Sequence, residues 1–118
     1  MCMRGDIYLI DFGTDTSSCV QSGVRPAVVV SNDRANRYSY AITVLPLTTK
    51  QKKPHLPTHV LIPRNPHYGL NKNSMVLAEQ LMTVDKRQLQ RRIGQVRDKD
   101  IMMQITNAMQ VQIGASEL

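Results

Sequence analysis

The architecture of this chain is most visible in the stretch Pro26-Ala27-Val28-Val29-Val30-Ser31. Three consecutive valines favour a β-strand, because branched side chains pack well on a pleated surface. The stretch has no polar alternation, which is typical of a strand buried on both faces. Asn32-Asp33 then offers a cap or a turn before a single helical turn over 34–38. The stretch therefore predicts a strand inside the core.

Further short strand patterns lie on both sides of this stretch along the chain. They cover residues 7–12, 41–48, 58–62 and 74–84, the last of them broken near Glu79. Pro46 has no N–H for a sheet ladder, so its strand is predicted to be an edge strand or to carry a bulge. Several short strands separated by turn residues predict a small β-barrel.

The last third of the chain changes to a helical period. Asp85 with Gln88 resembles a capping box and predicts a short helix through Arg92, which Gly94 ends. Asp98 is the predicted cap of a longer C-terminal helix. Its apolar stripe has helical spacing and comprises Ile101, Met102, Ile105, Ala108, Met109 and Ile113. The expected fold class is mainly β with a C-terminal helix, of the α+β type.

Composition narrows the classes of protein and partner. The 118 residues are 42% hydrophobic and 20% charged, which is typical of a globular protein and excludes a collagen-like or wholly disordered chain. We expect one domain over residues 1–118. Fifteen Lys and Arg against nine Asp and Glu leave a net charge of +6, which favours an anionic partner. Neither a membrane-spanning run nor a signal-peptide pattern is present, so we expect a cytoplasmic protein without a membrane partner.

Common catalytic and metal motifs are missing from the sequence. It contains no phosphate-binding Gly-x-x-x-x-Gly-Lys-[Ser/Thr], no Gly-x-Ser-x-Gly and no His-Glu-x-x-His. His55, His59 and His67 are spaced by four and eight in a proline-rich β region, and Cys2 and Cys19 form no Cys-x-x-Cys pair. We therefore expect no metal and no cofactor.

Two strand ends carry polar residues suited to phosphate. Arg25 stands directly before a buried strand, and Pro26 stiffens the chain after it. A guanidinium is a planar fork that matches phosphate oxygens, although a structural salt bridge is the alternative role. Thr48 and Thr49 end another strand, where their hydroxyls can contact phosphate or cap a turn.

A basic loop follows this second strand end. Lys50, Lys52 and Lys53 can follow a phosphate backbone, or simply form a solvated loop. Phe12 and four tyrosines are the whole aromatic content, which argues against an aromatic stacking platform for single strands.

At these residues the chain resembles the MazF/PemK family of toxins, and the Gram-positive MazF branch most closely. The resemblance runs from about residue 3 to about residue 113 and depends on several short motifs that occur in the family's order. These are Arg4-Gly5-Asp6-Ile7-Tyr8, Gly23-Val24-Arg25-Pro26-Ala27-Val28-Val29, Ser31-Asn32-Asp33, Leu47-Thr48-Thr49-Lys50, Leu56-Pro57-Thr58-His59-Val60 and Glu79-Gln80-Leu81-Met82-Thr83-Val84-Asp85-Lys86.

The resemblance implies a dimeric, SH3-like barrel that cleaves single-stranded RNA at specific sequences, together with an acidic antitoxin of the MazE kind. It implies that Arg25 and Thr48 are catalytic. It also assigns RNA contacts to Ser74 and Gln80, and to the loops before Gly23 and after Thr48, which hold the RNA-binding candidates Gln21, Thr49, Lys50, Lys52 and Lys53.

One stretch departs from the family. Many relatives carry Ser-Glu-Gln before the Gly-x-Arg-Pro motif, whereas this chain has Cys19-Val20-Gln21-Ser22 and keeps only the Gln. If the Glu helps to activate the nucleophile in relatives, that role is absent here or is supplied by another group.

RNA supplies its own nucleophile, the 2′-OH, so the expected reaction is metal-independent and gives a 2′,3′-cyclic phosphate and a 5′-OH. His59 is the candidate general acid or base because its ordinary pKa lies near neutrality, with a structural histidine as the alternative. Two other functions stay open: a non-enzymatic toxin of the CcdB type, which targets gyrase, and a basic barrel that binds RNA without cutting it.

Overall fold

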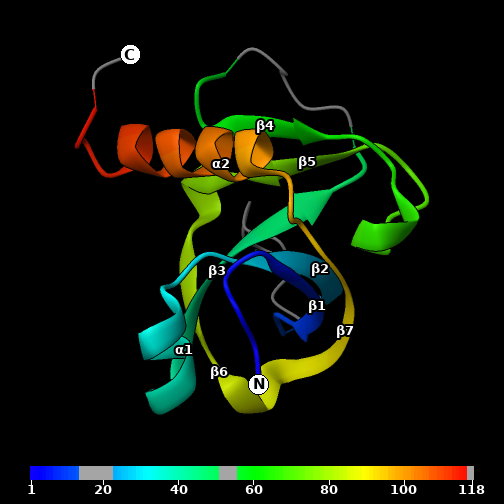
Figure 1. Ribbon diagram of the computed structural model, residues 1–118, viewed down its shortest axis with the longest axis vertical. Coiled ribbons are helices and arrows are strands. Elements are labelled where there is room, and N and C mark those ends of the chain that lie inside the picture. The colour runs from blue at the N-terminus through cyan, green and yellow to red at the C-terminus, as the bar shows by residue number, and fades with distance from the viewer. Residues whose placement is uncertain (14–22, 51–55, 117–118) are drawn as a thin grey trace.

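The computed structural model describes residues 1–13, 23–50 and 56–116. Its helices are α1 (Asp33–Tyr38) and α2 (Lys99–Gln112), and three 3-10 turns are η1 (Pro66–Tyr68), η2 (Ala78–Gln80) and η3 (Lys86–Gln88). The strands are β1 (Asp6–Asp11), β2 (Val24–Val29), β3 (Ala41–Thr48), β4 (His59–Ile62), β5 (Ser74–Leu77), β6 (Met82–Asp85) and β7 (Leu89–Gln95). Figure 1 shows α2 lying across β4 and β5, away from α1.

The strands form one antiparallel sheet in the order β4-β5-β3-β2-β1-β7. The long strand β3 joins its two halves: residues Ala41–Val44 pair with β6, and Leu47 and Thr48 pair with β5. In Figure 1 β3 runs diagonally between the lower strands and the pair β4–β5. The predicted class, mainly β with a C-terminal helix, is confirmed.

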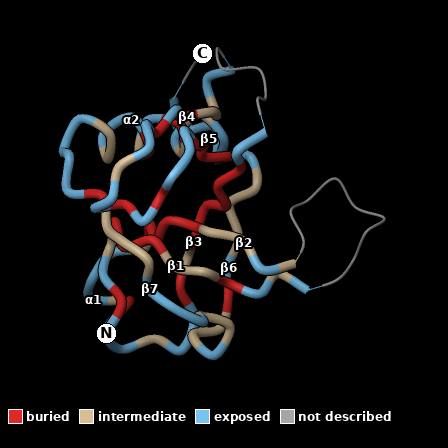
Figure 2. Tube along the Cα trace, turned by 90° about the vertical axis from the view of Figure 1, so that its right-hand side faces the viewer, coloured by how far each residue is buried: buried red, intermediate tan, exposed pale blue. Residues whose placement is uncertain are grey.

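Strand β2 is buried on both faces, as its composition predicts. Val28 and Val30 belong to a core cluster that also contains Leu45 of β3 and Ile105 of α2. Ala27 and Val29 point the other way, into a second cluster that comprises Cys2, Ile10, Ile42, Val44 and Val84 besides them. Figure 2 shows the buried segments running through the middle of the molecule. The sheet therefore curls around β2 and β3 with apolar side chains on either side.

Of the two alternatives predicted for Pro46, the edge strand is wrong. Strand β3 is central, with β2 on one edge and both β5 and β6 on the other. Pro46 is tolerated because β6 pairs with β3 as far as Val44 and β5 starts its pairing at Leu47. The proline thus lies opposite the η2 turn, which interrupts the ladder near the break that the sequence predicts at Glu79. A missing N–H costs little where the neighbouring strand is itself interrupted.

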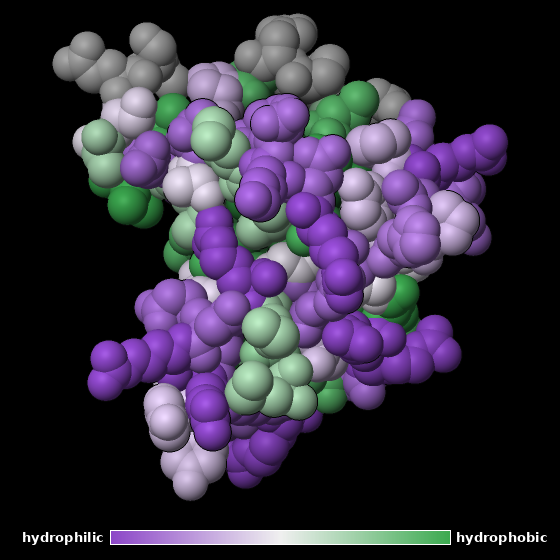
Figure 3. Space-filling view, viewed as in Figure 1, coloured by the Kyte–Doolittle hydropathy of each residue, from purple (hydrophilic) through white to green (hydrophobic). Residues whose placement is uncertain are grey.

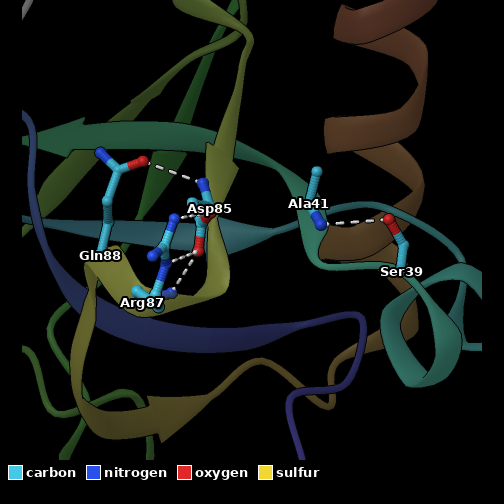
Figure 4. Close-up of polar contacts among 5 residues, drawn as sticks. All are labelled: Ser39, Ala41, Asp85, Arg87 and Gln88. Atoms are coloured by element: carbon cyan, nitrogen blue, oxygen red, sulfur yellow. Dashed lines mark hydrogen bonds and ion pairs between the residues drawn. The ribbon is translucent and has the colours of Figure 1, made fainter.

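The predicted helix from Asp85 through Arg92 is also wrong. The capping box is present, because the Asp85 carboxylate accepts from Arg87 N–H and the Gln88 side chain accepts from Asp85 N–H at 2.8 Å (Figure 4). It starts only the three-residue turn η3, after which the chain extends as β7. Strand β7 pairs with β1, and this long-range pairing outweighs a local helix signal.

The C-terminal helix agrees with its predicted cap. The Asp98 carboxylate accepts from the N–H groups of Asp100 and Ile101, and Ile105 and Ala108 are buried against the sheet. Arg4 fastens the N-terminal segment to this helix, since its guanidinium donates to Thr106 Oγ1 at 2.6 Å and to the Val30 carbonyl. In the described part of the chain no helix has the length and apolar character needed to cross a membrane.

Candidate active site

Arg25 and Thr48 lie on neighbouring strands at one end of the sheet. Strands β2 and β3 are antiparallel, with Ala27 opposite Pro46. The paired residues end there: Arg25 lies two residues before Ala27, and Thr48 lies two residues after Pro46, so both stand at the same end of the β2–β3 pair. Residues two apart along a strand share a face, so both positions belong to the face of the Ala27–Pro46 pair. The structure thus places at one end of two paired strands the two residues for which the family resemblance implies catalysis.

Thr48 is held firmly at the end of β3. It is 4% exposed and lies opposite Met75 of β5. Its hydroxyl oxygen accepts a hydrogen bond from the Lys50 backbone N–H at 3.2 Å. A hydroxyl has one proton to donate, and this contact uses an acceptor lone pair instead. The proton of the Thr48 hydroxyl therefore stays available for a second partner.

Arg25 is half-buried and lies near the start of β2. Its β1 neighbour is Ile10, which is fully buried. The aliphatic part of an arginine packs on such apolar surface while its charged head reaches toward solvent. Pro26 restricts the backbone after it. The guanidinium is thereby presented from a rigid strand rather than from a loop.

Two segments that hold candidate RNA contacts adjoin the ends of these strands. Backbone hydrogen bonds from Phe12 N–H to Gly23 O and from Gly23 N–H to Gly13 O close the base of the 14–22 segment. The 51–55 segment begins directly after the exposed residues Thr49 and Lys50. The predicted contacts within these segments lie outside the described residues: they are Gln21, Lys52 and Lys53.

Ser74 and Gln80 lie apart from this pair. Met75 is opposite Thr48 and shares its face, so the Ser74 side chain projects from the other face. Ser74 is buried, and its hydroxyl donates to the Lys72 carbonyl at 3.1 Å. Gln80 ends η2, beyond the opposite end of β5. Their roles in RNA contact stay predictions.

His59 is separated from Thr48 by the width of β5. Its ring Nε2 lies 2.8 Å from Glu79 Oε1, and the His59 side chain is 4% exposed. Together with Pro57 and Val60 it lines one side of a groove whose other side is formed by α2. Sequence reasoning missed the Glu79 contact because a separation of twenty residues leaves no local signal. The structure therefore does not bring His59 to the Arg25–Thr48 corner.

The described residues offer no ready metal site. Among them, no three His, Cys, Asp or Glu side chains come together as metal ligands. His67 lies in η1, beside Asn65 and Arg97, and away from His59.

Comparison with known proteins gives one consistent result. Residues 3–113 match the family described as PemK-like, MazF-like toxin of type II toxin-antitoxin system. Over 114 residues the chain is 38% identical to the Endoribonuclease MazF of Staphylococcus saprophyticus, covering 97% of this chain and 92% of that protein.

Solved structures agree with this match. A mycobacterial endoribonuclease in complex with its cognate antitoxin superposes with a TM-score of 0.79 and 25% identity, over 100% of both chains. The MazF of Deinococcus radiodurans superposes with a TM-score of 0.78 over 96% of each chain and, at 21% identity, supports the fold. The chain therefore belongs to the PemK-like, MazF-like family of toxins from type II toxin–antitoxin systems.

Proposed function

We propose that this protein is a toxin that acts as a sequence-specific endoribonuclease on single-stranded RNA. The observation that carries the proposal is that Arg25, at the start of β2, and Thr48, at the end of β3, lie at the same end of this antiparallel strand pair. The family match and the 38% identity to an Endoribonuclease MazF support it. The net charge of +6 suits a polyanionic substrate.

The reaction needs no protein nucleophile. The 2′-oxygen of one nucleotide forms a bond to the adjacent phosphorus, and the bond from phosphorus to the 5′-oxygen of the next nucleotide breaks. The 2′-OH loses its proton to a base, and the leaving 5′-oxygen takes one up. The products are a 2′,3′-cyclic phosphate and a 5′-OH. The protein must align these atoms and stabilise the charge that builds on the phosphorane.

Arg25 is the proposed source of that stabilisation. A guanidinium remains protonated throughout and donates two parallel N–H bonds to phosphate oxygens. By analogy with the loss of one oxyanion-hole donor, its removal should cost about 10²–10³ in rate. Thr48 is the proposed second donor, and it either binds the same phosphate or orients the 2′-OH.

The general base and acid are a separate question. A guanidinium is a poor base, so Arg25 does not fill this role. His59 is the alternative candidate. Its contact with Glu79 and its position across β5 favour a structural role instead. Replacement of His55, His59 and His67 by Gln tests histidine catalysis as a whole.

The proposal also includes the protein's partners. We expect an acidic antitoxin that competes with RNA phosphates for the basic surface, so its inhibition should weaken as salt rises. We also propose a homodimer, since Leu61 on the edge strand β4 and Met103 on α2 are large apolar residues at least half exposed. We place this action in the cytoplasm, where messenger RNA is found, and treat residues 1–118 as one toxin domain.

The test is RNA cleavage in EDTA by the wild type and by Arg25→Ala, on a long unstructured RNA whose ends are mapped by mass spectrometry. We expect discrete cuts with cyclic-phosphate and 5′-OH ends, lost in Arg25→Ala and kept in Arg64→Ala, a control that removes another arginine. Intact RNA with the wild type would refute the proposal. Gyrase inhibition or salt-dependent RNA binding without cleavage would then identify one of the two alternatives.

A further inference from the structure

We propose that a second surface, formed by Arg34, Arg37, Tyr38, Tyr40 and Lys86, holds the single-stranded RNA on one side of the cleavage site. We call it the tyrosine patch. It lies where β3 begins, whereas Thr48 lies where β3 ends. The inference rests on the proposed ribonuclease function and adds a binding surface remote from the catalytic corner.

The helical part of the patch is a single face of α1. Arg34, Arg37 and Tyr38 are spaced by three and four residues, so their side chains are neighbours on the helix surface. The Arg37 guanidinium lies over the Tyr38 ring, 5.5 Å from its centre, and Tyr38 is 73% exposed. A ring with a cation on one face resembles the arginine-aromatic combinations that stack on bases.

The rest of the patch belongs to the adjoining strand entry. Tyr40 is 86% exposed, yet its backbone is fixed because its carbonyl accepts from Lys86 N–H at 2.8 Å. Ser39 Oγ accepts from Ala41 N–H at 3.0 Å, and Ala41 pairs with Asp85. Figure 4 shows this turn beside η3. Both tyrosines are thus presented from an ordered backbone, which lowers the entropy lost when a base stacks on them.

The charges around the patch favour a polyanion. Arg34, Arg37 and Lys86 contribute three positive charges, and Figure 3 shows hydrophilic side chains over α1 at the lower left. Two acidic groups adjoin the patch: Asp33 accepts from the backbone N–H of Arg4 at 2.6 Å, and the Asp85 carboxylate is paired with the Arg87 guanidinium, which balances its charge.

Exposed aromatic faces among cations match the chemistry of single-stranded nucleic acid, which offers bases to stack and phosphates to pair. An acidic protein segment would use the cations but would not need two exposed rings. The overall scarcity of aromatic residues argues against a stacking platform. The structure qualifies that argument, because two of the four tyrosines, only two residues apart in the chain, are both largely exposed here.

The distance between the tyrosine patch and Thr48 sets the length of RNA that can contact both. From Ala41 to Thr48, strand β3 spans about 24 Å at ~3.4 Å per residue. At ~3.4 Å per stacked nucleotide, that is about seven nucleotides. An oligonucleotide of about six nucleotides around the cut is therefore too short to contact both places, and one of about twenty is long enough.

The experiment compares these two lengths, both taken from a site mapped with the wild type. Binding is measured with RNA that carries a 2′-deoxy nucleotide at the cut, which removes the nucleophile. In Tyr38→Ala/Tyr40→Ala, affinity for the long RNA should fall about 5- to 100-fold, in line with the loss of one stacked base. Cleavage of the short RNA should not change. Tyr38→Phe/Tyr40→Phe keeps the rings and should bind as the wild type does.

The arginines give an independent readout. Arg34→Gln/Arg37→Gln should reduce the salt slope of long-RNA binding by about 1.4, from ~0.7 per phosphate contact on a single strand. Arg64→Gln/Arg97→Gln, with the same loss of charge elsewhere, should leave that slope nearer the wild type.

If the tyrosine variants bind and cut long RNA as the wild type does, the patch is refuted while the ribonuclease stands. If only binding to an acidic peptide falls, the patch is a protein-binding surface and the inference is wrong. If the wild type cuts no RNA, the proposed function itself fails.

Discussion

The backbone N–H of Lys50 donates a hydrogen bond to the hydroxyl oxygen of Thr48 at 3.2 Å, directly after β3 ends. This contact fixes a side chain that is already buried. It also assigns the hydroxyl a direction, because the oxygen accepts from within the protein and the proton is left for the substrate. A short turn of main chain thus prepares Thr48 as a donor at the proposed cleavage site.

Removal of this hydroxyl should impair cleavage more than folding. Thr48→Val keeps the branched shape but has no proton to donate and leaves Lys50 N–H without its acceptor. We expect single-turnover RNA cleavage to fall about 10²-fold or more, by analogy with the loss of one transition-state donor. Thr48→Ser keeps the hydroxyl and should retain most of the activity.

Thermal unfolding of the three proteins separates the two effects. An intramolecular hydrogen bond contributes about 0.5–1.5 kcal/mol, and Lys50 is exposed so that water can replace the lost acceptor, so Thr48→Val should unfold at only a slightly lower temperature. Equal cleavage rates for Thr48→Val and the wild type would show that the hydroxyl does not act in the reaction.

For His59, in contrast to Thr48, substitution should impair folding more than cleavage. Since β5 separates His59 from Thr48 and the ring is bound to Glu79, His59→Gln should cut RNA at close to the wild-type rate. The free energy of unfolding should fall, because a buried side chain loses its charged partner. Cleavage assays and urea unfolding on the same preparations check both. A loss of cleavage in a stably folded variant would place His59 in the chemistry.

The sequence predicts the part of this fold in which local pattern and tertiary role agree. The valines of β2 indicate burial on both faces, and each face does meet its own cluster. Arg25 and Thr48 are marked by their positions at strand ends. That both lie at the same end of the β2–β3 pair follows only from the register of these strands, which a single sequence does not show.

The errors occur where a distant partner overrides a local signal. Asp85 and Gln88 form the predicted capping box, yet β7 takes over at Leu89 because β1 offers it a full-length neighbour. Pro46 is an edge signal by itself and becomes acceptable only beside the η2 break. At both places the pairing with strands distant in sequence decides the local structure, and residue propensities alone do not predict it.

Alkaline pH should destabilise the protein through the buried Cys2 thiol and the half-buried Tyr8 phenol. Burial raises the pKa of the Cys2 thiol above its ordinary 9.0, and burial, then the Asp6 charge, raises the pKa of the Tyr8 phenol above its ordinary 10.0. Above these ordinary values the unfolded chain loses protons that the folded protein still holds. The free energy of unfolding must therefore decrease as pH rises.

Urea unfolding between about pH 8 and pH 11 measures this slope. Cys2→Ala should flatten its lower part and Tyr8→Phe its upper part, each by the contribution of one proton. Tyr40→Phe removes an exposed phenol and is the matched control. A slope that stays unchanged in both Cys2→Ala and Tyr8→Phe would assign the pH dependence to other groups.

The contact between η1 and β7 predicts the most damaging small substitution. A Cβ on Gly94 would lie 2.2 Å from the Tyr68 carbonyl carbon and 2.5 Å from the His67 oxygen, and one on Gly69 would lie 2.1 Å from the Ile93 oxygen. These neighbours are main chain, so they cannot rotate away as a side chain would. Gly94→Ala should therefore lower the free energy of unfolding by about 3 kcal/mol, the upper range for overpacking.

Gly114→Ala is the matched control, because it isolates backbone conformation from space. Gly114 has a φ of +76°, and no described atom lies within 4 Å of the place that an alanine methyl group would take. Only the left-handed backbone therefore opposes alanine there, at about 1–2 kcal/mol. Urea unfolding of both variants gives the comparison. If Gly94→Ala costs no more than Gly114→Ala, then η1 can move off β7 without loss. A larger loss of unfolding free energy for Gly94→Ala shows that the close contact between the backbones of η1 and β7 stabilises this edge of the sheet.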